Sequence, residues 1–288
     1  MKKIIERLLL FFIGIPLVFS LVYFLPYYNH LALNIAVIFF SGLGAIELSS
    51  MLEKKLIHIP KPESFIIGAL APLAVTLDIS FNIHQWIAPL LIMAGAFWSL
   101  ISKVFSRKTQ IENITNHIIG RFSLLVYPGF FMSWLILLSG RENSAAILLF
   151  LFITFGNDSF AWLFGTLFGK NNRGIINVSP NKSIAGFIGG LLGSVLVAAA
   201  LVLLFPSHFP FLHGTSAASM IIISVITGFC TGAAACVGDL TESAIKRSCD
   251  FKDSGNFMLG RGGVLDSIDS IAVAAPVFFF LYIRLFNA

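Results

Sequence analysis

Acidic and basic side chains gather in one stretch near the C-terminus, SAIKRSCDFKDSGNFMLGRGGVLDSIDS at residues 243–270. Lys246 and Arg247 come first, and Asp266 and Asp269 follow, three residues apart, where a long apolar segment begins. Carboxylate oxygens are ligands that Mg²⁺ prefers, and lysine and arginine bind phosphate groups. These residue types therefore suit metal-assisted chemistry on a phosphorylated substrate.

Two glycines, Gly262 and Gly263, come just before the aspartates. Glycine permits a positive φ and close backbone approach, so successive N–H groups there can hold an anion. Alternatively, the glycines only make the turn into the next helix, while Asp266 and Asp269 cap that helix and offset its dipole. Both interpretations stay open, although Asp269 would lie one turn inside the membrane, a costly place for a capping residue.

A second pattern runs upstream of the aspartates. Asp239, Ser243, Lys246 and Arg247 have the spacing i, i+4, i+7 and i+8, so they share one face if the segment is helical. Such a face can hold a divalent metal at Asp239 and phosphates at the two cations. An intrahelical series of ion pairs explains the same spacing and stays an alternative.

Other charged residues lie inside or beside apolar segments. Glu47 and Asp158 are carboxylates at membrane depth, where ionisable groups are costly and usually functional. Asp158 has no cation near it in sequence, so it needs a metal or a partner from another helix, or it is a hydrogen-bonded structural residue. Lys182, at a helix start, either binds phosphate or anchors the chain at the membrane surface.

The rest of the chain avoids charge. Of its 288 residues, 57% are hydrophobic and 11% are charged, whereas a soluble domain has about 25% charged residues. Apolar runs of about 20 residues, each long enough to cross a bilayer, recur along the chain. We therefore expect an all-α, polytopic integral membrane protein with about nine transmembrane helices, near 8–28, 31–52, 64–80, 85–105, 118–139, 145–168, 184–205, 217–240 and 267–286.

Most of the 19 Lys and Arg residues fall at the N-terminus and in alternate loops. Because cytoplasmic loops are enriched in these residues, we expect a cytoplasmic N-terminus and a charged C-terminal loop that faces the cytoplasm. We divide the chain into an N-terminal transmembrane region, 1–140, with about five helices, and a C-terminal catalytic region, 141–288, with about four. The short loops favour a bacterial inner membrane.

The charged stretch also resembles a known family signature. It reads Ser243-Ala-Ile-Lys246-Arg247, then Lys252-Asp253, then Gly260-x-Gly262-Gly263-x-Leu265-Asp266-x-Ile268-Asp269, and Gly238-Asp239 precedes it. This order resembles the C-terminal signature of the phosphatidate cytidylyltransferases, also called CDP-diacylglycerol synthases. The segments Asp158-x-x-Ala161-Trp162, Phe168-Gly169-Lys170 and Ser179-Pro180-x-Lys182-Ser183-x-x-Gly186 resemble the same family.

The resemblance implies an integral membrane enzyme that converts CTP and phosphatidic acid into CDP-diacylglycerol and pyrophosphate, with membrane lipids around it and no nucleic acid partner. It implies Mg²⁺, as two divalent ions or as one divalent and one monovalent ion. The implied catalytic residues are Asp239, Lys246, Arg247 and Asp266, and the implied metal ligands are Asp239 and Asp266, with Asp269 and Asp158 as further candidates. The implied contacts to phosphate are Lys182, Ser243, Lys252, Gly262 and Gly263. A homodimer stays open.

Four features depart from the family pattern. Arg261 stands where the family usually has His, Ser267 where it has Arg, and Ala185 where it has Glu. The segment Gly156-Asn157-Asp158-Ser159 replaces the more common Asp-Thr-Gly type of motif. Ala185 and Ser267 keep open an inactive relative that binds lipid or nucleotide. A related CTP-dependent enzyme acting on another lipid, of the polyprenol kinase or CDP-archaeol synthase type, is a separate alternative. A transporter is disfavoured because no inverted hydropathy repeat is evident.

Overall fold

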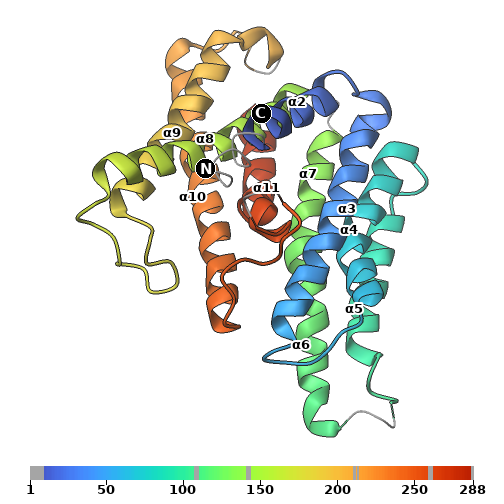
Figure 1. Ribbon diagram of the computed structural model, residues 1–288. Coiled ribbons are helices and arrows are strands. Elements are labelled where there is room, and N and C mark those ends of the chain that lie inside the picture. The colour runs from blue at the N-terminus through green and yellow to red at the C-terminus, as the bar shows by residue number, and fades with distance from the viewer. Residues whose placement is uncertain are drawn as a thin grey trace. The chain divides into compact units, whose positions relative to one another are not determined.

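The computed structural model describes residues 10–106, 110–140, 144–209, 212, 214–258 and 262–286. Within these ranges the chain consists of helices and loops and has no β-strand, which confirms the all-α prediction (Figure 1). Contacts divide the chain into two compact units, residues 1–142 with 245–268 and residues 143–244 with 269–288. The first unit thus combines the N-terminal helices with most of the charged C-terminal stretch.

The first unit contains six α-helices and three shorter helical turns before the charged stretch. They are η1 (Leu10–Gly14), α2 (Ile15–Tyr23), α3 (Tyr27–Leu52), α4 (Lys61–Phe81), α5 (Ile87–Ile101), η2 (Ile111–Asn113), α6 (Ile114–Leu124), η3 (Leu125–Phe130) and α7 (Phe131–Ser139). Helices α3 and α4 lie side by side (Figure 1). Gly68 faces Ser41 and Ala45, and such small residues let membrane helices approach closely.

The segment from α6 to α7 is helical throughout, with a π-helical turn, η3, in its middle. Pro128 lies in this turn, and proline has no N–H to donate to the preceding turn, so the helix widens locally instead of breaking. One turn before η3, the buried Arg121 donates from Nε to Glu63 Oε1 of α4 at 2.8 Å. Trp98 of α5 donates to the same oxygen at 3.2 Å. The pair of the buried Arg121 with the partly exposed Glu63 thus ties three helices of the first unit together.

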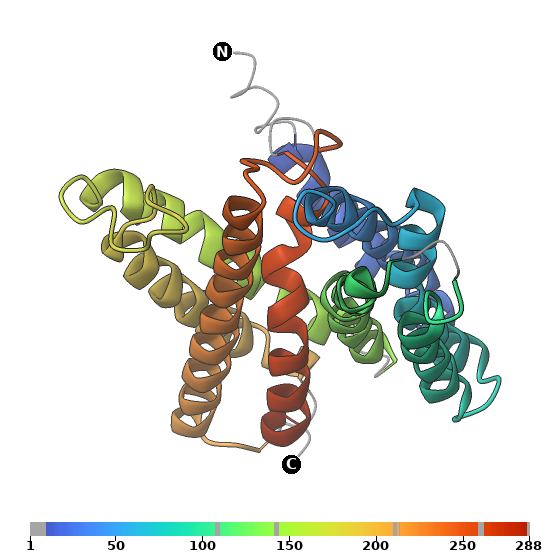
Figure 2. The same cartoon turned by 90° about the horizontal axis from the view of Figure 1, so that it is seen from below.

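The second unit contains α8 (Ser144–Phe168), α9 (Ile184–Leu204), η4 (Pro206–His208), most of α10 (Ala217–Ser248) and most of α11 (Leu265–Phe286). Helices α8 and α9 form a tightly packed pair, in which Phe164 and Phe160 of α8 pack against Gly189 and Gly193 of α9. The second half of the unit has α10 and α11 side by side, orange and red in Figure 2, with Gly238 against the backbone of Asp269.

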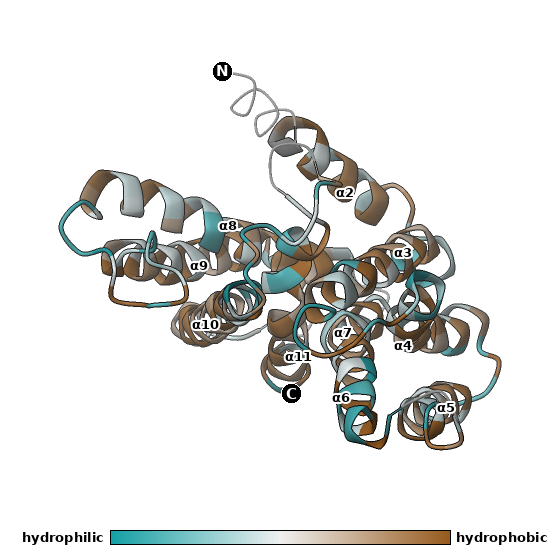
Figure 3. Cartoon of the chain, turned by 60° about the horizontal axis from the view of Figure 1, so that its bottom comes forward, coloured by the Kyte–Doolittle hydropathy of each residue, from teal (hydrophilic) through white to brown (hydrophobic). Residues whose placement is uncertain are grey.

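By length and composition, seven of the described helices could each cross a membrane. They correspond to seven of the nine expected spans, and hydrophobic residues predominate along them (Figure 3). The other two expected spans, the first and the fourth, contain shorter apolar helices, Phe12–Tyr23 and Ile87–Ile101. The chain therefore has the architecture of a polytopic integral membrane protein, with two segments shorter than the roughly 20 residues that a crossing helix needs.

Candidate functional site

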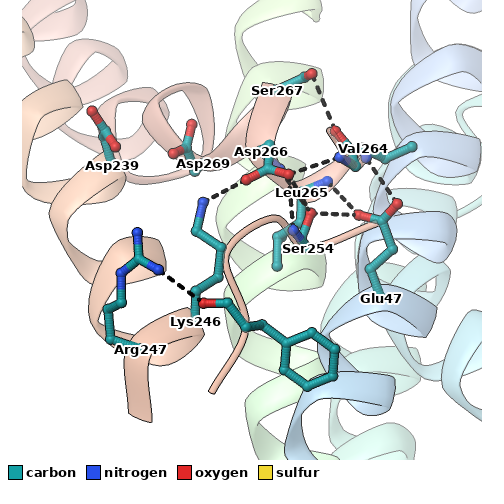
Figure 4. Close-up of polar contacts among 12 residues, drawn as sticks. Glu47, Asp239, Lys246, Arg247, Ser254, Val264, Leu265, Asp266, Ser267 and Asp269 are labelled. Carbon is teal, nitrogen blue, oxygen red and sulfur yellow. Dashed lines mark hydrogen bonds and ion pairs between the residues drawn. The ribbon is translucent and has the colours of Figure 1, made fainter. Parts of the chain in front are cut away.

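The first polar cluster surrounds Asp266, the second residue of α11. One carboxylate oxygen, Oδ1, pairs with the Lys246 ammonium near the end of α10. The other, Oδ2, accepts hydrogen bonds from the backbone N–H groups of Gly263 at 2.7 Å and Ser254 at 2.9 Å. The Ser254 hydroxyl lies 3.0 Å from the same oxygen. Both oxygens of Asp266 are therefore held by donors within the protein, as Figure 4 shows.

Glu47, six residues before the C-cap residue Glu53 of α3, completes this cluster. Its Oε1 accepts from the N–H of Val264 at 2.9 Å, and its Oε2 accepts from the N–H of Leu265 at 2.8 Å. These N–H groups lie at the start of α11, where a helix has unsatisfied donors and a partial positive charge. Ser254 lies between the two carboxylates (Figure 4), with its Oγ 2.9 Å from Glu47 Oε2. One hydroxyl thus links Glu47 to Asp266.

The glycine turn predicted from the sequence is present directly before α11. Gly262 has a φ of +112°, which side-chain-bearing residues rarely adopt, and it pairs with the backbone of Met258. A Cβ on Gly263 would overlap the Ser254 hydroxyl and the Glu47 carboxylate. The N–H groups of residues 263–265 therefore form an anion-binding turn, and the anions that they hold are the protein's own carboxylates.

The basic residues of the charged stretch differ in exposure. Lys246 is buried against Asp266, whereas Arg247 and Lys252 are exposed. Arg247 donates from Nη1 to the carbonyl oxygen of Phe251 at 3.2 Å. The exposed cations remain accessible to a phosphorylated ligand, and the buried one serves first to neutralise a carboxylate.

A separate acid–lysine pair lies in the second unit. Lys182, next to the N-cap residue Ser183 of α9, pairs through Nζ with Asp239 Oδ2 on α10. The ammonium also lies 5.7 Å from the ring centroid of Phe187. The Asp239 side chain is 37% exposed, whereas that of Asp266 is 8% exposed. Asp239 is thus the carboxylate of the two that a ligand in solution reaches more easily.

The remaining predicted residues also lie in the second unit. Asp269 is buried, and its Oδ1 accepts from the N–H of Ser270 at 2.6 Å. Asp158 is partly buried on α8, next to Asn157, which donates to Ser194 Oγ at 3.0 Å. Ser243 is partly buried on α10, which is helical from Ala217 to Ser248 as the one-face spacing requires.

The donor set constrains how a metal could bind. Among the described residues, no group of three or more His, Cys, Asp and Glu side chains is placed to hold a metal ion. Mg²⁺, however, is usually bound through one or two carboxylates together with substrate phosphates. The half-open Asp239 fits such a ligand, provided that Lys182 moves aside. Asp266 fits less directly, because both of its oxygens already accept hydrogen bonds.

Two contributors to the first cluster have no assigned role in the sequence interpretation. Glu47 is visible as an acidic residue inside an apolar segment, but its partners lie more than 200 residues away. Ser254 carries no recognisable signal, because a serine in a polar loop is ordinary. Of the departures from the family pattern, Ser267 places its hydroxyl 3.4 Å from the Gly263 carbonyl, Ala185 lies in the first turn of α9, and Arg261 lies outside the described residues.

The sequence is similar to one known protein family and to several of its members. The model of the cytidylyltransferase family matches residues 5–286. The phosphatidate cytidylyltransferase of Haemophilus influenzae is 34% identical over 218 residues, which cover 72% of each chain. That of Staphylococcus haemolyticus is 30% identical over 240 residues, covering 83% of this chain and 85% of the relative. An uncharacterized Escherichia coli protein, YnbB, is 35% identical over 153 residues, 51% of this chain and 47% of that protein.

Proposed function

Because this chain belongs to the cytidylyltransferase family, we propose that it transfers the cytidylyl group of CTP to phosphatidic acid, forming CDP-diacylglycerol and releasing pyrophosphate. The observation that carries the proposal is the family match, which spans nearly the whole chain and includes both acid–lysine pairs. The named relatives of Haemophilus and Staphylococcus support phosphatidic acid as the acceptor lipid.

The reaction needs two anions to meet. A phosphate oxygen of phosphatidic acid attacks the α-phosphorus of CTP, a new P–O bond forms, and the bond to the oxygen that leads to the β-phosphorus breaks. Pyrophosphate leaves with the electron pair of that bond. The protein must therefore position the reactants and neutralise their charge, rather than form covalent bonds itself.

We assign the neutralising role to the basic residues. Arg247 and Lys252 are exposed cations in the charged stretch, and Lys182 and Lys246 are cations that neighbouring carboxylates hold in place. Ser243 is a further proposed contact to phosphate. The N–H groups of Gly262 and Gly263 donate to Met258 and to Asp266, and they would bind phosphate by exchanging these acceptors. An arginine binds two phosphate oxygens at once, which suits Arg247 for orienting the nucleotide.

We further propose that the activity depends on Mg²⁺. The ion, when bound, would neutralise phosphate charge and stabilise the leaving pyrophosphate. Asp239 would hold it together with substrate oxygens, and Asp269 and Asp158 are the additional carboxylates that the family pattern suggests. Asp266 would keep Lys246 and the glycine turn in place and would contribute charge to the same chemistry.

We propose that the protein lies in the inner membrane, with nine membrane segments, a cytoplasmic N-terminus and a site open to cytoplasmic CTP. Basic residues at the N-terminus and in alternate loops support this orientation. Labelling of single introduced cysteines in intact cells tests each loop, and light scattering of the purified protein tests for a homodimer.

A direct assay tests the activity. Purified full-length protein is incubated with radiolabelled CTP, phosphatidic acid and Mg²⁺, and chloroform-soluble label is measured. We expect labelled CDP-diacylglycerol with phosphatidic acid, and none with diacylglycerol or a polyprenol as acceptor. Complete chelation should abolish the product. Label in a different lipid would replace the acceptor in the proposal, and activity that survives chelation would overturn the metal dependence.

A further inference from the structure

We infer that Glu47 is a positioning residue. It holds the start of α11 and, through Ser254, keeps the Asp266 carboxylate in the orientation that the proposed reaction needs. This inference rests on the proposed function, because it assigns Glu47 a part in the rate of the same reaction. Glu47 itself does not contact the proposed substrate groups. It acts through Ser254 and the start of α11 on Asp266.

The Glu47 carboxylate lies at the start of α11. It accepts from the N–H groups of Val264 and Leu265 at 2.9 and 2.8 Å, at the positive end of α11. Asp266 follows these residues directly. A carboxylate fixed on α3 therefore determines where the first turn of α11 lies, and with it where the Asp266 side chain begins.

Ser254 links the two carboxylates. Its Oγ lies 2.9 Å from Glu47 Oε2 and 3.0 Å from Asp266 Oδ2, and its N–H donates to Asp266 Oδ2 at 2.9 Å. A hydroxyl carries one hydrogen, so it donates to only one of the two carboxylates at a time. The two negative charges thus share one donor, and a change at Glu47 alters the hydrogen bonding of Asp266.

The loop backbone also fits closely against the Glu47 carboxylate. A Cβ on Gly255 or on Gly263 would overlap the Glu47 carboxylate. The loop between α10 and α11 therefore wraps the carboxylate closely on two sides. A second contact fixes the same loop to the end of α3, where the Lys54 ammonium lies 4.2 Å from the centroid of the Phe251 ring. The loop is thus held at two points by one helix.

The consequence for the reaction is geometric. Phosphoryl-type transfer depends on reactant placement, and a displacement of about 1 Å at a positioning group costs about 100-fold in rate. Glu47→Gln keeps the length of the side chain and one acceptor oxygen. It replaces the other oxygen with an NH₂ donor that faces a backbone N–H or the Ser254 hydroxyl. We therefore expect the start of α11 to shift while the membrane helices stay packed.

The test compares Glu47→Gln with Glu53→Gln in the full-length protein. Glu53 terminates the same helix, is exposed, and pairs with His58 at 2.9 Å, away from the loop. In the CTP assay we expect kcat of Glu47→Gln to fall about 10- to 100-fold, with KM for CTP within about threefold of wild type. Glu53→Gln should match wild type. Rates are taken per folded protein, well below the melting temperature, so that a loss of folded enzyme is not counted.

A second readout follows the turn itself. Hydrogen exchange of the peptide that contains residues 254–265 should become faster in Glu47→Gln and stay unchanged in Glu53→Gln. Ser254→Ala, made alone and together with Glu47→Gln, tests the link. We expect the combined loss in kcat to be smaller than the product of the single losses, because both changes break one path.

The measurements test separately the role of Glu47, the route through Ser254 and the proposed function. Unchanged kcat and exchange in Glu47→Gln would overturn the inference, and independent effects of the two changes would overturn the route through Ser254. If Glu47→Gln does not fold, normal turnover in Ser254→Ala would overturn that route equally. Wild-type protein without cytidylyltransferase activity would instead refute the proposed function, and the hydrogen-exchange comparison would still decide whether Glu47 holds the turn.

Discussion

The two acid–lysine pairs use the same residue types in different settings. The side chains of Lys246 and Asp266 are 11% and 8% exposed, and backbone N–H groups also bind the carboxylate. The side chains of Lys182 and Asp239 are 24% and 37% exposed, and their carboxylate is held by the lysine. A buried pair is rigid and strongly destabilised when one partner is removed, whereas an exposed pair contributes little to stability and exchanges partners easily.

The difference suggests a division of work. The Asp266 pair is built into the turn before α11 and suits a role in organising the site. The Asp239 pair is open and suits a role in binding ions and phosphates as they arrive. Burial and the number of donors, not residue type, separate the two roles. Substitutions at matched positions in the two pairs test whether burial separates their roles.

The largest effect is expected for Asp266→Asn. Loss of the charge leaves Lys246 facing a neutral amide and weakens the hydrogen bonds from Ser254 and Gly263, so kcat should fall about 100- to 1,000-fold. The melting temperature in detergent should fall further than for Asp239→Asn, because the pair at Asp266 is buried. Near-normal turnover of CTP would remove Asp266 from the site.

At saturating Mg²⁺, Asp239→Asn should lower kcat less than Asp266→Asn does. If this carboxylate is a metal ligand, its loss weakens Mg²⁺ binding, so the Mg²⁺ concentration for half-maximal activity should rise about 10-fold or more. The melting temperature should stay close to wild type, since the residue is partly exposed. A metal titration of both variants checks this, and an unchanged midpoint in Asp239→Asn would reassign the ligand.

The two lysines should differ in their effect on stability. Lys246→Met leaves a buried carboxylate without its cation, at a cost of about 3 kcal/mol. Lys182→Met removes a partly exposed partner and should cost at most about 1 kcal/mol, less at high salt. Unfolding in mixed micelles at two ionic strengths measures both. Equal losses would mean that burial does not distinguish the pairs.

The smallest effect is expected for Ser267→Ala. The Ser267 hydroxyl makes one long contact, 3.4 Å from the Gly263 carbonyl, within the first turn of α11. Its removal should change the free energy of unfolding by less than about 0.5 kcal/mol and leave turnover near wild type. A large loss of activity would show that this departure from the family pattern is compensated through the serine itself.

Much of the helical framework could be predicted from hydropathy. The expected spans 184–205 and 267–286 lie within two residues of Ile184–Leu204 and Leu265–Phe286. A run of apolar residues in a bilayer must be helical to satisfy its backbone, so composition decides the element. The expected spans near 8–28 and 85–105 contain shorter helices, Phe12–Tyr23 and Ile87–Ile101. Pro26 follows the first helix, and the polar residues His84 and Lys103 lie on either side of the second.

The membrane class, the helical spans, and the acids, bases and glycines of the charged stretch can be derived from the sequence, because they follow from local composition and spacing. The partners of those charged residues depend on the tertiary fold. Lys246 pairs with Asp266, Lys182 with Asp239, and Glu47 reaches Ser254 across 207 positions in the chain. Hydrogen bonds and ion pairs form between groups a few ångströms apart in space. The local sequence around each residue therefore does not show which distant residue is its partner.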